Sequence, residues 1–300
     1  MMIETGIPQL RDPFLLRHNG VYYMYGTGVA SNGDWIDTTY ACWRNDTGRL
    51  DSGWARLDTP ERPIYVRPAA AEKNLWAPEV HFYKGAFYLL ATYFSSRTQH
   101  RGATILRASS PEGPFVEITD GTMTPPAWDC IDATLYIDRD GQPWLVFVHE
   151  WTCTPDHVGT MAAARLSDDL THLLSEPIEL FRGDAPAWAT AKITDGCFMY
   201  TTRTGRLLML WSNFDKGGYC EAIACSDNGR LDGQWLHAEK PLFTRGMAGE
   251  HDGGHGMIFT DTDGKSYLCL HAPNKPTPER REMPILIPVR EENGTLVCAL

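Results

Sequence analysis

A five-fold recurrence of one β-hairpin pattern constrains the fold of this 300-residue chain more than any other feature of its sequence. Each copy has a polar residue, a short apolar run, an X-Gly turn and a more continuous second apolar run, as in TDGCFMYTTRTGRLLMLWSNF. Such turns favour hairpins because glycine takes a positive φ without steric cost. The five turns are Asn19-Gly20, Lys84-Gly85, Asp140-Gly141, Thr204-Gly205 and Asp263-Gly264.

Further strand-like segments follow most of the hairpins, for example ATILRASSPEGPF and EAIACSDNGRLDGQW. A repeat of roughly 55 to 65 residues with about four strands is the signature of a β-propeller blade. We therefore predict an all-β fold, a five-bladed β-propeller with about four antiparallel strands per blade, in which residues 1–300 form one domain. The alternative is a β-sandwich, or two β domains joined near Pro125-Pro126, and the regular recurrence disfavours it.

Composition excludes several classes of function. The net charge is −11 and no Lys/Arg cluster occurs, which argues against a nucleic-acid partner. No stretch approaches the roughly 18 apolar residues that span a bilayer, so we expect no membrane partner. The start, MMIETGIPQL, lacks the features of a signal peptide, and we predict a cytoplasmic protein. The eight scattered cysteines contain no CxxC pair and are interpreted as free thiols.

Each repeat begins with a residue capable of acid–base chemistry. The first strand of a propeller blade lines the central channel, so residues at its start should converge at one mouth of that channel. Neighbouring carboxyl groups raise one another's pKa, which suits proton transfer at neutral pH. These side chains could alternatively cap turns, although that is a weaker explanation for all five together. The leading residues are Asp12, Glu79, Asp132, Asp195 and His255.

Five motifs around these positions resemble glycoside hydrolase family 43, which comprises five-bladed propeller enzymes acting on arabinose- and xylose-containing glycans. The resemblance covers nearly the whole chain, and together the motifs are specific. They are RDPF, LWAPEVHFY at residues 75–83, IDATLYID at residues 131–138, TDGCFMY, and GGHGMIF at residues 253–259.

The family works by inversion with three carboxyl groups. The resemblance implies that Asp12 is the general base that activates water, and that Asp132 orients the general acid and tunes its pKa. The acid of the family is usually a Glu in a Glu-Gly pair, whereas this chain has Asp195-Gly196. Because Asp reaches about 1.5 Å less than Glu, Glu150 in VFVHEW is the alternative acid, and we favour Asp195.

Two further positions carry roles implied by the resemblance. Glu79 matches a usually acidic position near the sugar and is assigned to substrate hydrogen bonding, with a buried structural acceptor as the alternative. His255 in GGHG matches a channel histidine beside a water-coordinated cation, commonly Ca²⁺. We expect that cation to be structural or electrostatic, helping to keep Asp12 ionised, and no organic cofactor is implied.

Sugar rings stack on aromatic side chains, and this chain has ten tryptophans. Trp76, directly before Ala-Pro-Glu, is the strongest candidate for the pocket wall. Further candidates for sugar subsites are Trp35, Trp128, Trp151 and Trp188. A loop with Arg97, His100 and Arg101 could close over the channel mouth.

The leading hypothesis is an inverting hydrolase that releases α-L-arabinofuranosyl or β-D-xylosyl units from small oligosaccharides. The alternative is a non-catalytic carbohydrate-binding propeller in which the Glu-to-Asp change marks a lost acid. A phosphorylase is disfavoured because the leading residues are nearly all acidic. Arabinose or xylose specificity, exo or endo action, and oligomeric state stay open at this point.

Overall fold

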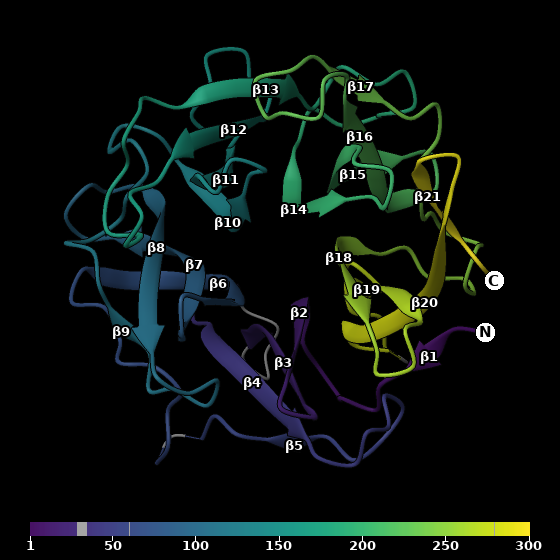
Figure 1. The fold of residues 1–300 in the computed structure, drawn as a ribbon, viewed down its shortest axis with the longest axis horizontal. Helices are drawn as coiled ribbons and strands as arrows, with labels where there is room; N and C mark the ends of the chain where they lie inside the picture. Colours follow the sequence, from purple (N-terminus) through teal and green to yellow (C-terminus); the bar gives the residue numbers. More distant parts are fainter. Residues whose placement is uncertain (29–34, 60, 279) are drawn as a thin grey trace.

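Five antiparallel sheets surround one central axis in the computed structural model, which describes residues 1–28, 35–59, 61–278 and 280–300 (Figure 1). This arrangement confirms the five-bladed β-propeller and excludes the β-sandwich. Blade one contains β2 (Arg11–His18), β3 (Val21–Gly28), β4 (Thr39–Asn45) and β5 (Ala55–Arg56). Blade two contains β6 (Ala71–Tyr83), β7 (Ala86–Ser95), β8 (Arg101–Ala108) and β9 (Val116–Glu117).

The remaining blades repeat this order. Blade three contains β10 (Cys130–Ile137), β11 (Pro143–His149), β12 (Thr160–Arg165) and β13 (Ile178–Arg182). Blade four contains β14 (Asp195–Thr201), β15 (Leu207–Asp215), β16 (Gly218–Ser226) and β17 (Trp235–His237). Blade five contains β18 (Gly254–Thr260), β19 (Ser266–Ala272), β20 (Met283–Glu292), β21 (Thr295–Cys298) and β1 (Ile3–Glu4).

The two ends of the chain meet in blade five. The N-terminal β1 pairs antiparallel with β20, so the first residues of the sequence complete the last blade and close the ring (Figure 1). Apolar side chains from neighbouring blades then pack face to face, for example Leu145 and Phe147 of blade three in one cluster with Leu90 of blade two. The described residues include no α-helix, and hence none that could cross a membrane. All eight cysteines are free thiols.

Every innermost strand is interrupted by a bulge at the same place. The pairing register of the first two strands shifts after Arg11, Trp76, Ile131, Asp195 and Gly254, respectively. The residue that follows each of these has a positive φ, a conformation that side chains rarely adopt. These residues are Asp12 (51°), Ala77 (45°), Asp132 (55°), Gly196 (43°) and His255 (52°).

The positions of the bulges show that two of the five predicted leading residues are not equivalent to the other three. Asp12, Asp132 and His255 occupy equivalent left-handed positions, but Asp195 lies one residue before that position in its strand and Glu79 lies two residues after it. The two-residue period of a strand cannot reveal such a bulge, because the extra residue has no pairing partner.

The left-handed residues link the blades by hydrogen bonds from their backbone N–H groups. In four blades the acceptor is a side chain on the second strand of the preceding blade. The pairs are Ala77 to Thr27 Oγ1 (2.7 Å), Asp132 to Thr92 Oγ1 (3.0 Å), His255 to Ser212 Oγ (2.7 Å) and Asp12 to His271 Nδ1 (3.2 Å). In blade four Val148 stands at the acceptor position, and the Gly196 N–H donates instead to Asp132 Oδ2 at 2.9 Å.

Candidate active site

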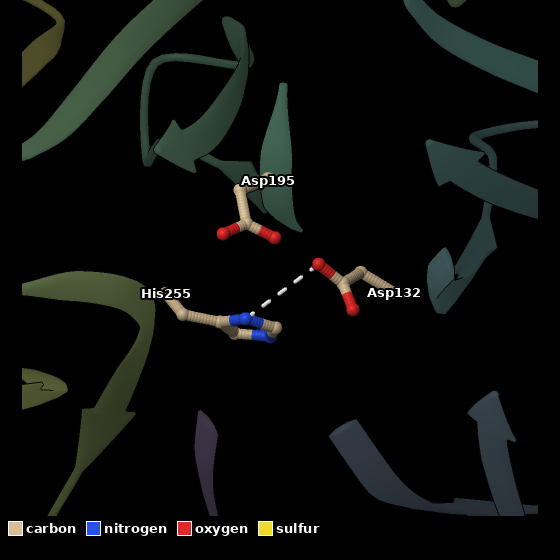
Figure 2. A group of neighbouring side chains, drawn as sticks. All are labelled: Asp132, Asp195 and His255. Atoms are coloured by element: carbon tan, nitrogen blue, oxygen red, sulfur yellow. Dashed lines mark ion pairs between the residues drawn. The ribbon is translucent and has the colours of Figure 1, made fainter. Parts of the chain in front are cut away.

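A pocket at one mouth of the channel brings together most of the predicted site residues. Asp12, Asp132 and Asp195 come from three separate blades, and Figure 2 shows the side chains of Asp132, Asp195 and His255 converging on the axis from β10, β14 and β18. The pocket is lined by Arg11, Asp12, Thr27, Trp35, Trp76, Ile131, Asp132, Glu150, Trp151, Asp195 and His255. The convergence predicted from the sequence is therefore present for all the carboxyl candidates except Glu79.

Asp12 is held as an ionised carboxylate. Thr27 Oγ1 donates a 2.6 Å hydrogen bond to its Oδ2, and Nδ1 of His255 lies 3.2 Å from its Oδ1. Burial alone raises the pKa of Asp12, but the charges of His255 and Arg11 outweigh burial and lower this pKa to about 2. A carboxylate that keeps its charge in a buried pocket is suited to accept a proton.

Asp132 and Asp195 are neighbouring carboxyl groups whose pKa shifts run opposite to that of Asp12, and Asp132 is buried while Asp195 is half-buried. Burial raises the pKa of Asp132 to about 6, and the charge of Asp12 adds to this effect. Burial and the adjacent Asp132 raise the pKa of Asp195 well above its ordinary value, which favours the protonated form of this carboxyl group. The Tyr219 hydroxyl donates to Asp195 Oδ2 at 2.6 Å. Asp12, with a lowered pKa, and Asp195, with a raised pKa, thus face one pocket.

Glu150 lies at the pocket edge in an ion pair. Its Oε2 accepts a 2.7 Å hydrogen bond from Nε of Arg101. Burial raises the pKa of Glu150, but the charge of Arg101 opposes this increase. Asp195 has no cation at hydrogen-bond distance among the described residues, and its carboxyl neighbour favours the neutral form. The geometry therefore favours Asp195 over Glu150 as a proton donor.

The residue after Asp195 must be small because His255 packs directly against it. A Cβ atom on Gly196 would lie 2.6 Å from Cγ of the His255 ring, and the φ of Gly196 is also positive. The Asp-Gly pair noticed in the sequence therefore combines a proton donor with the space for its neighbour. His255 reaches past Gly196 to lie 3.7 Å from Asp132 Oδ2 (Figure 2).

Tryptophans form the apolar wall of the pocket. Trp76, Trp35 and Trp151 line it, and Nε1 of Trp76 donates to the Trp35 carbonyl oxygen at 2.8 Å. The other two candidates pack elsewhere: Trp128 stacks on His149 with ring centroids 3.8 Å apart, and Trp188 packs against Trp211.

The residues of the loop after β7 differ in whether they contact the pocket. Arg101 reaches the pocket through Glu150 and also lies 5.8 Å from the Trp76 ring, whereas Arg97 pairs with Asp120 on the exposed surface. His100 Nδ1 lies 3.5 Å from Asp129. Of the three residues predicted to cover the mouth, Arg101 forms an ion pair with the pocket residue Glu150.

Glu79 is placed differently from its expected position. It is buried, and its Oε2 lies 2.9 Å from Nε2 of His81 rather than among the residues that line the pocket. In β6 the left-handed position equivalent to Asp12 and Asp132 is occupied by Ala77, and Glu79 lies two residues further along the strand. Glu79 thus lies outside the pocket lining, and its recorded partner is the His81 ring.

Several supporting residues were not anticipated from the sequence. Arg11 lies beneath Trp35, with its guanidinium carbon 3.6 Å from the ring centroid, and pairs with Glu282. Tyr219 contacts Asp195, and Glu221 accepts hydrogen bonds from Ser212 Oγ (2.7 Å) and the Gly256 N–H (2.9 Å). No pattern in GGYCEAIAC distinguishes these two from ordinary strand residues.

Asp132, Asp195 and His255 are also close enough to be considered as metal ligands, since one donor atom from each lies within 4.8 Å of the others. Ca²⁺ prefers six to eight oxygen ligands. Two carboxyl groups with raised pKa values offer too little negative charge for a direct carboxylate cage around Ca²⁺. The donor set fits a cation that keeps most of its water and lies beside the imidazole.

An axial pocket that combines a carboxyl group of lowered pKa, a carboxyl group of raised pKa and tryptophan walls is typical of enzymes that hydrolyse glycosides. The model of the family "Glycosyl hydrolases family 43" matches residues 10–295. The chain belongs to this family, which confirms the resemblance inferred from the sequence motifs.

Known proteins similar to this chain include enzymes of arabinan and xylan breakdown. The extracellular exo-α-(1→5)-L-arabinofuranosidase ArbA of Cellvibrio japonicus is 25% identical over 88% of this chain and 78% of its own. An endo-arabinase from Bacteroides thetaiotaomicron is 32% identical, with a TM-score of 0.78 over 98% of both chains. A structure titled endo-1,4-β-xylanase from the same organism is 24% identical, with a TM-score of 0.77 over 99% of this chain and 97% of its own, which shows the shared fold.

Glu221 makes folding stability depend on pH. Burial raises the pKa of Glu221 from 4.5 to about 8. Because the folded state retains this proton while the unfolded state releases it, the contribution to stability falls as the pH rises from 4.5 to 8. We expect Glu221→Gln to reduce the loss of unfolding free energy between pH 5 and pH 8, measured by urea denaturation. The exposed Glu239→Gln is the control, and equal pH slopes for Glu221→Gln and the parent protein would contradict the assignment.

Proposed function

We propose that the protein is an inverting glycoside hydrolase that releases α-L-arabinofuranosyl or β-D-xylosyl units from oligosaccharides. The carrying observation is that Asp12, whose pKa is lowered, and Asp195, whose pKa is raised, line the same pocket. The names of the relatives, which include an arabinofuranosidase and an arabinanase, make α-L-arabinofuranosides the first substrates to test.

The mechanism follows from the state of each carboxyl group. Asp12 removes a proton from a water molecule as the water oxygen attacks the anomeric carbon. At the same time Asp195 donates its proton to the departing glycosidic oxygen. The attack comes from the face opposite the leaving group, so the configuration at the anomeric carbon inverts. Inversion requires the two carboxyl groups to be separated by roughly 6.5 to 9.5 Å, enough room for the water.

Asp132 supports the acid. Its Oδ2 accepts the Gly196 N–H at 2.9 Å, which fixes its position next to Asp195. Its negative charge raises the pKa of Asp195, so Asp132 keeps the donor protonated until the leaving group takes the proton. The tryptophan wall formed by Trp76 and Trp151 would stack against the sugar face.

The first prediction removes the proposed base. Asp12→Asn keeps the shape of the side chain but cannot accept the water proton, so we expect at least about a hundredfold loss of kcat. Release of 4-nitrophenol from 4-nitrophenyl α-L-arabinofuranoside measures kcat. NMR of the sugar first formed by the parent protein should show the inverted anomer. Asp232→Asn, on the surface, is the control. Full activity of Asp12→Asn would remove Asp12 from the mechanism, whereas binding of pentose oligosaccharides by the parent protein without sugar release would establish the carbohydrate-binding alternative.

The second prediction separates the two candidate acids. Asp195→Ala should lose most activity on unactivated oligosaccharides but retain it on aryl glycosides, because a good leaving group departs without a proton. Glu150→Ala should lower both activities by similar factors. The ratio of kcat/KM on the two substrates is the measurement, and a selective loss in Glu150→Ala alone would assign the acid to Glu150.

We also propose that a hydrated Ca²⁺ can bind in the channel beside His255. Its positive charge would help to keep the nearby Asp12 ionised, while Asp132 and Asp195 remain free for proton transfer. Addition of Ca²⁺ should raise the Tm of the parent protein and leave that of His255→Ala unchanged. An equal shift in both proteins would place the bound ion elsewhere.

A further inference from the structure

We propose that Tyr219 is a positioning residue for the general acid: its hydroxyl holds Oδ2 of Asp195 so that the transferable proton resides on Oδ1. This inference rests on the proposed function, because it concerns how Asp195 donates a proton. Tyr219 belongs to β16, the third strand of blade four, and it reaches Asp195 at the start of β14 in the same blade.

The contact is short and shielded from water. The Tyr219 hydroxyl lies 2.6 Å from Asp195 Oδ2, and the tyrosine is only 1% exposed. Burial and the nearby Asp195 raise the pKa of Tyr219 well above its ordinary value, so its oxygen keeps its hydrogen. Tyr219 is therefore the donor and Asp195 Oδ2 the acceptor in this hydrogen bond.

The Tyr219 ring is fixed on both sides. It packs against Phe214, with ring centroids 5.2 Å apart, and stacks on His271 at 5.9 Å, while its backbone N–H donates to Asp252 Oδ2 at 3.1 Å. The ring also passes close to Gly254, where an added Cβ would lie 2.6 Å from Tyr219 Cε1. The hydroxyl consequently has little freedom to leave the carboxyl group.

This hydrogen bond distinguishes the two oxygens of the acid. A neutral carboxyl group accepts best through its carbonyl oxygen and donates through its hydroxyl oxygen. With Oδ2 occupied as an acceptor, Oδ1 is the favoured site for the proton. An aspartate has one torsion fewer than the glutamate usual in the family, so fixing its carboxyl plane also fixes the direction in which the proton is offered.

Tyr219→Phe tests the inference because it removes the hydroxyl and keeps the ring. We expect kcat to fall at least about tenfold on an unactivated arabinofuranosyl disaccharide and less than about threefold on 4-nitrophenyl α-L-arabinofuranoside, since acid catalysis contributes about 10²- to 10⁴-fold. KM should change little. Tyr25→Phe is the matched control, because the buried Tyr25 hydroxyl donates a 2.6 Å hydrogen bond to the Pro111 carbonyl oxygen, away from the pocket.

A double variant keeps the test decisive. Tyr219→Phe added to Asp195→Ala should cause no further selective loss. The inference is overturned if Tyr219→Phe lowers both activities equally, or if Tyr219→Phe behaves like Tyr25→Phe. Failure of the proposed function would look different, since the parent protein would then hydrolyse neither substrate.

Discussion

The site depends on the hydrogen bonds that join each innermost strand to the preceding blade. A left-handed residue turns its N–H toward a neighbouring blade and its side chain toward the axis, so the link between blades also aims the functional groups. Asp132 and His255 are positioned in this way, through Thr92 and Ser212. Because an unpaired buried N–H is costly, the replacement of an acceptor by Val148 in blade three has to be compensated, and the Asp132 carboxylate supplies the missing acceptor.

That compensation connects architecture with chemistry. Three carboxyl groups withdrawn from solvent into one pocket would all resist ionisation, and their partners determine which of them keeps its charge. Asp12 is surrounded by Arg11, His255 and a threonine hydroxyl, and its pKa falls. Asp195 has Asp132 beside it, and its pKa rises. The asymmetry needed by an acid–base pair thus depends on neighbours from different blades, His255 beside Asp12 and Asp132 beside Asp195, which only the closed ring brings together.

The sequence predicted those features that depend on residues close together in the chain. Hairpin turns and apolar runs lie close together in the chain, so the blades and the first-strand carboxyl groups Asp12 and Asp132 were predictable. The bulges were not, because an unpaired residue leaves no trace in a two-residue period, and Glu79 was misplaced for that reason. Tyr219 was missed because its contact with Asp195 spans 24 residues and links strands that are not hydrogen-bonded to each other.

The shorter acid of this chain is best understood together with its surroundings. Gly196 lets the His255 ring approach to a distance that any Cβ would prevent, and Gly254 does the same for the Tyr219 ring. Gly196 lies in β14 and Gly254 in β18. Because neither residue has a side chain, the rings of His255 and Tyr219 can pack close to the Asp195 carboxyl group. An aspartate in such a compact setting needs orientation more than reach, and the tyrosine hydroxyl supplies it.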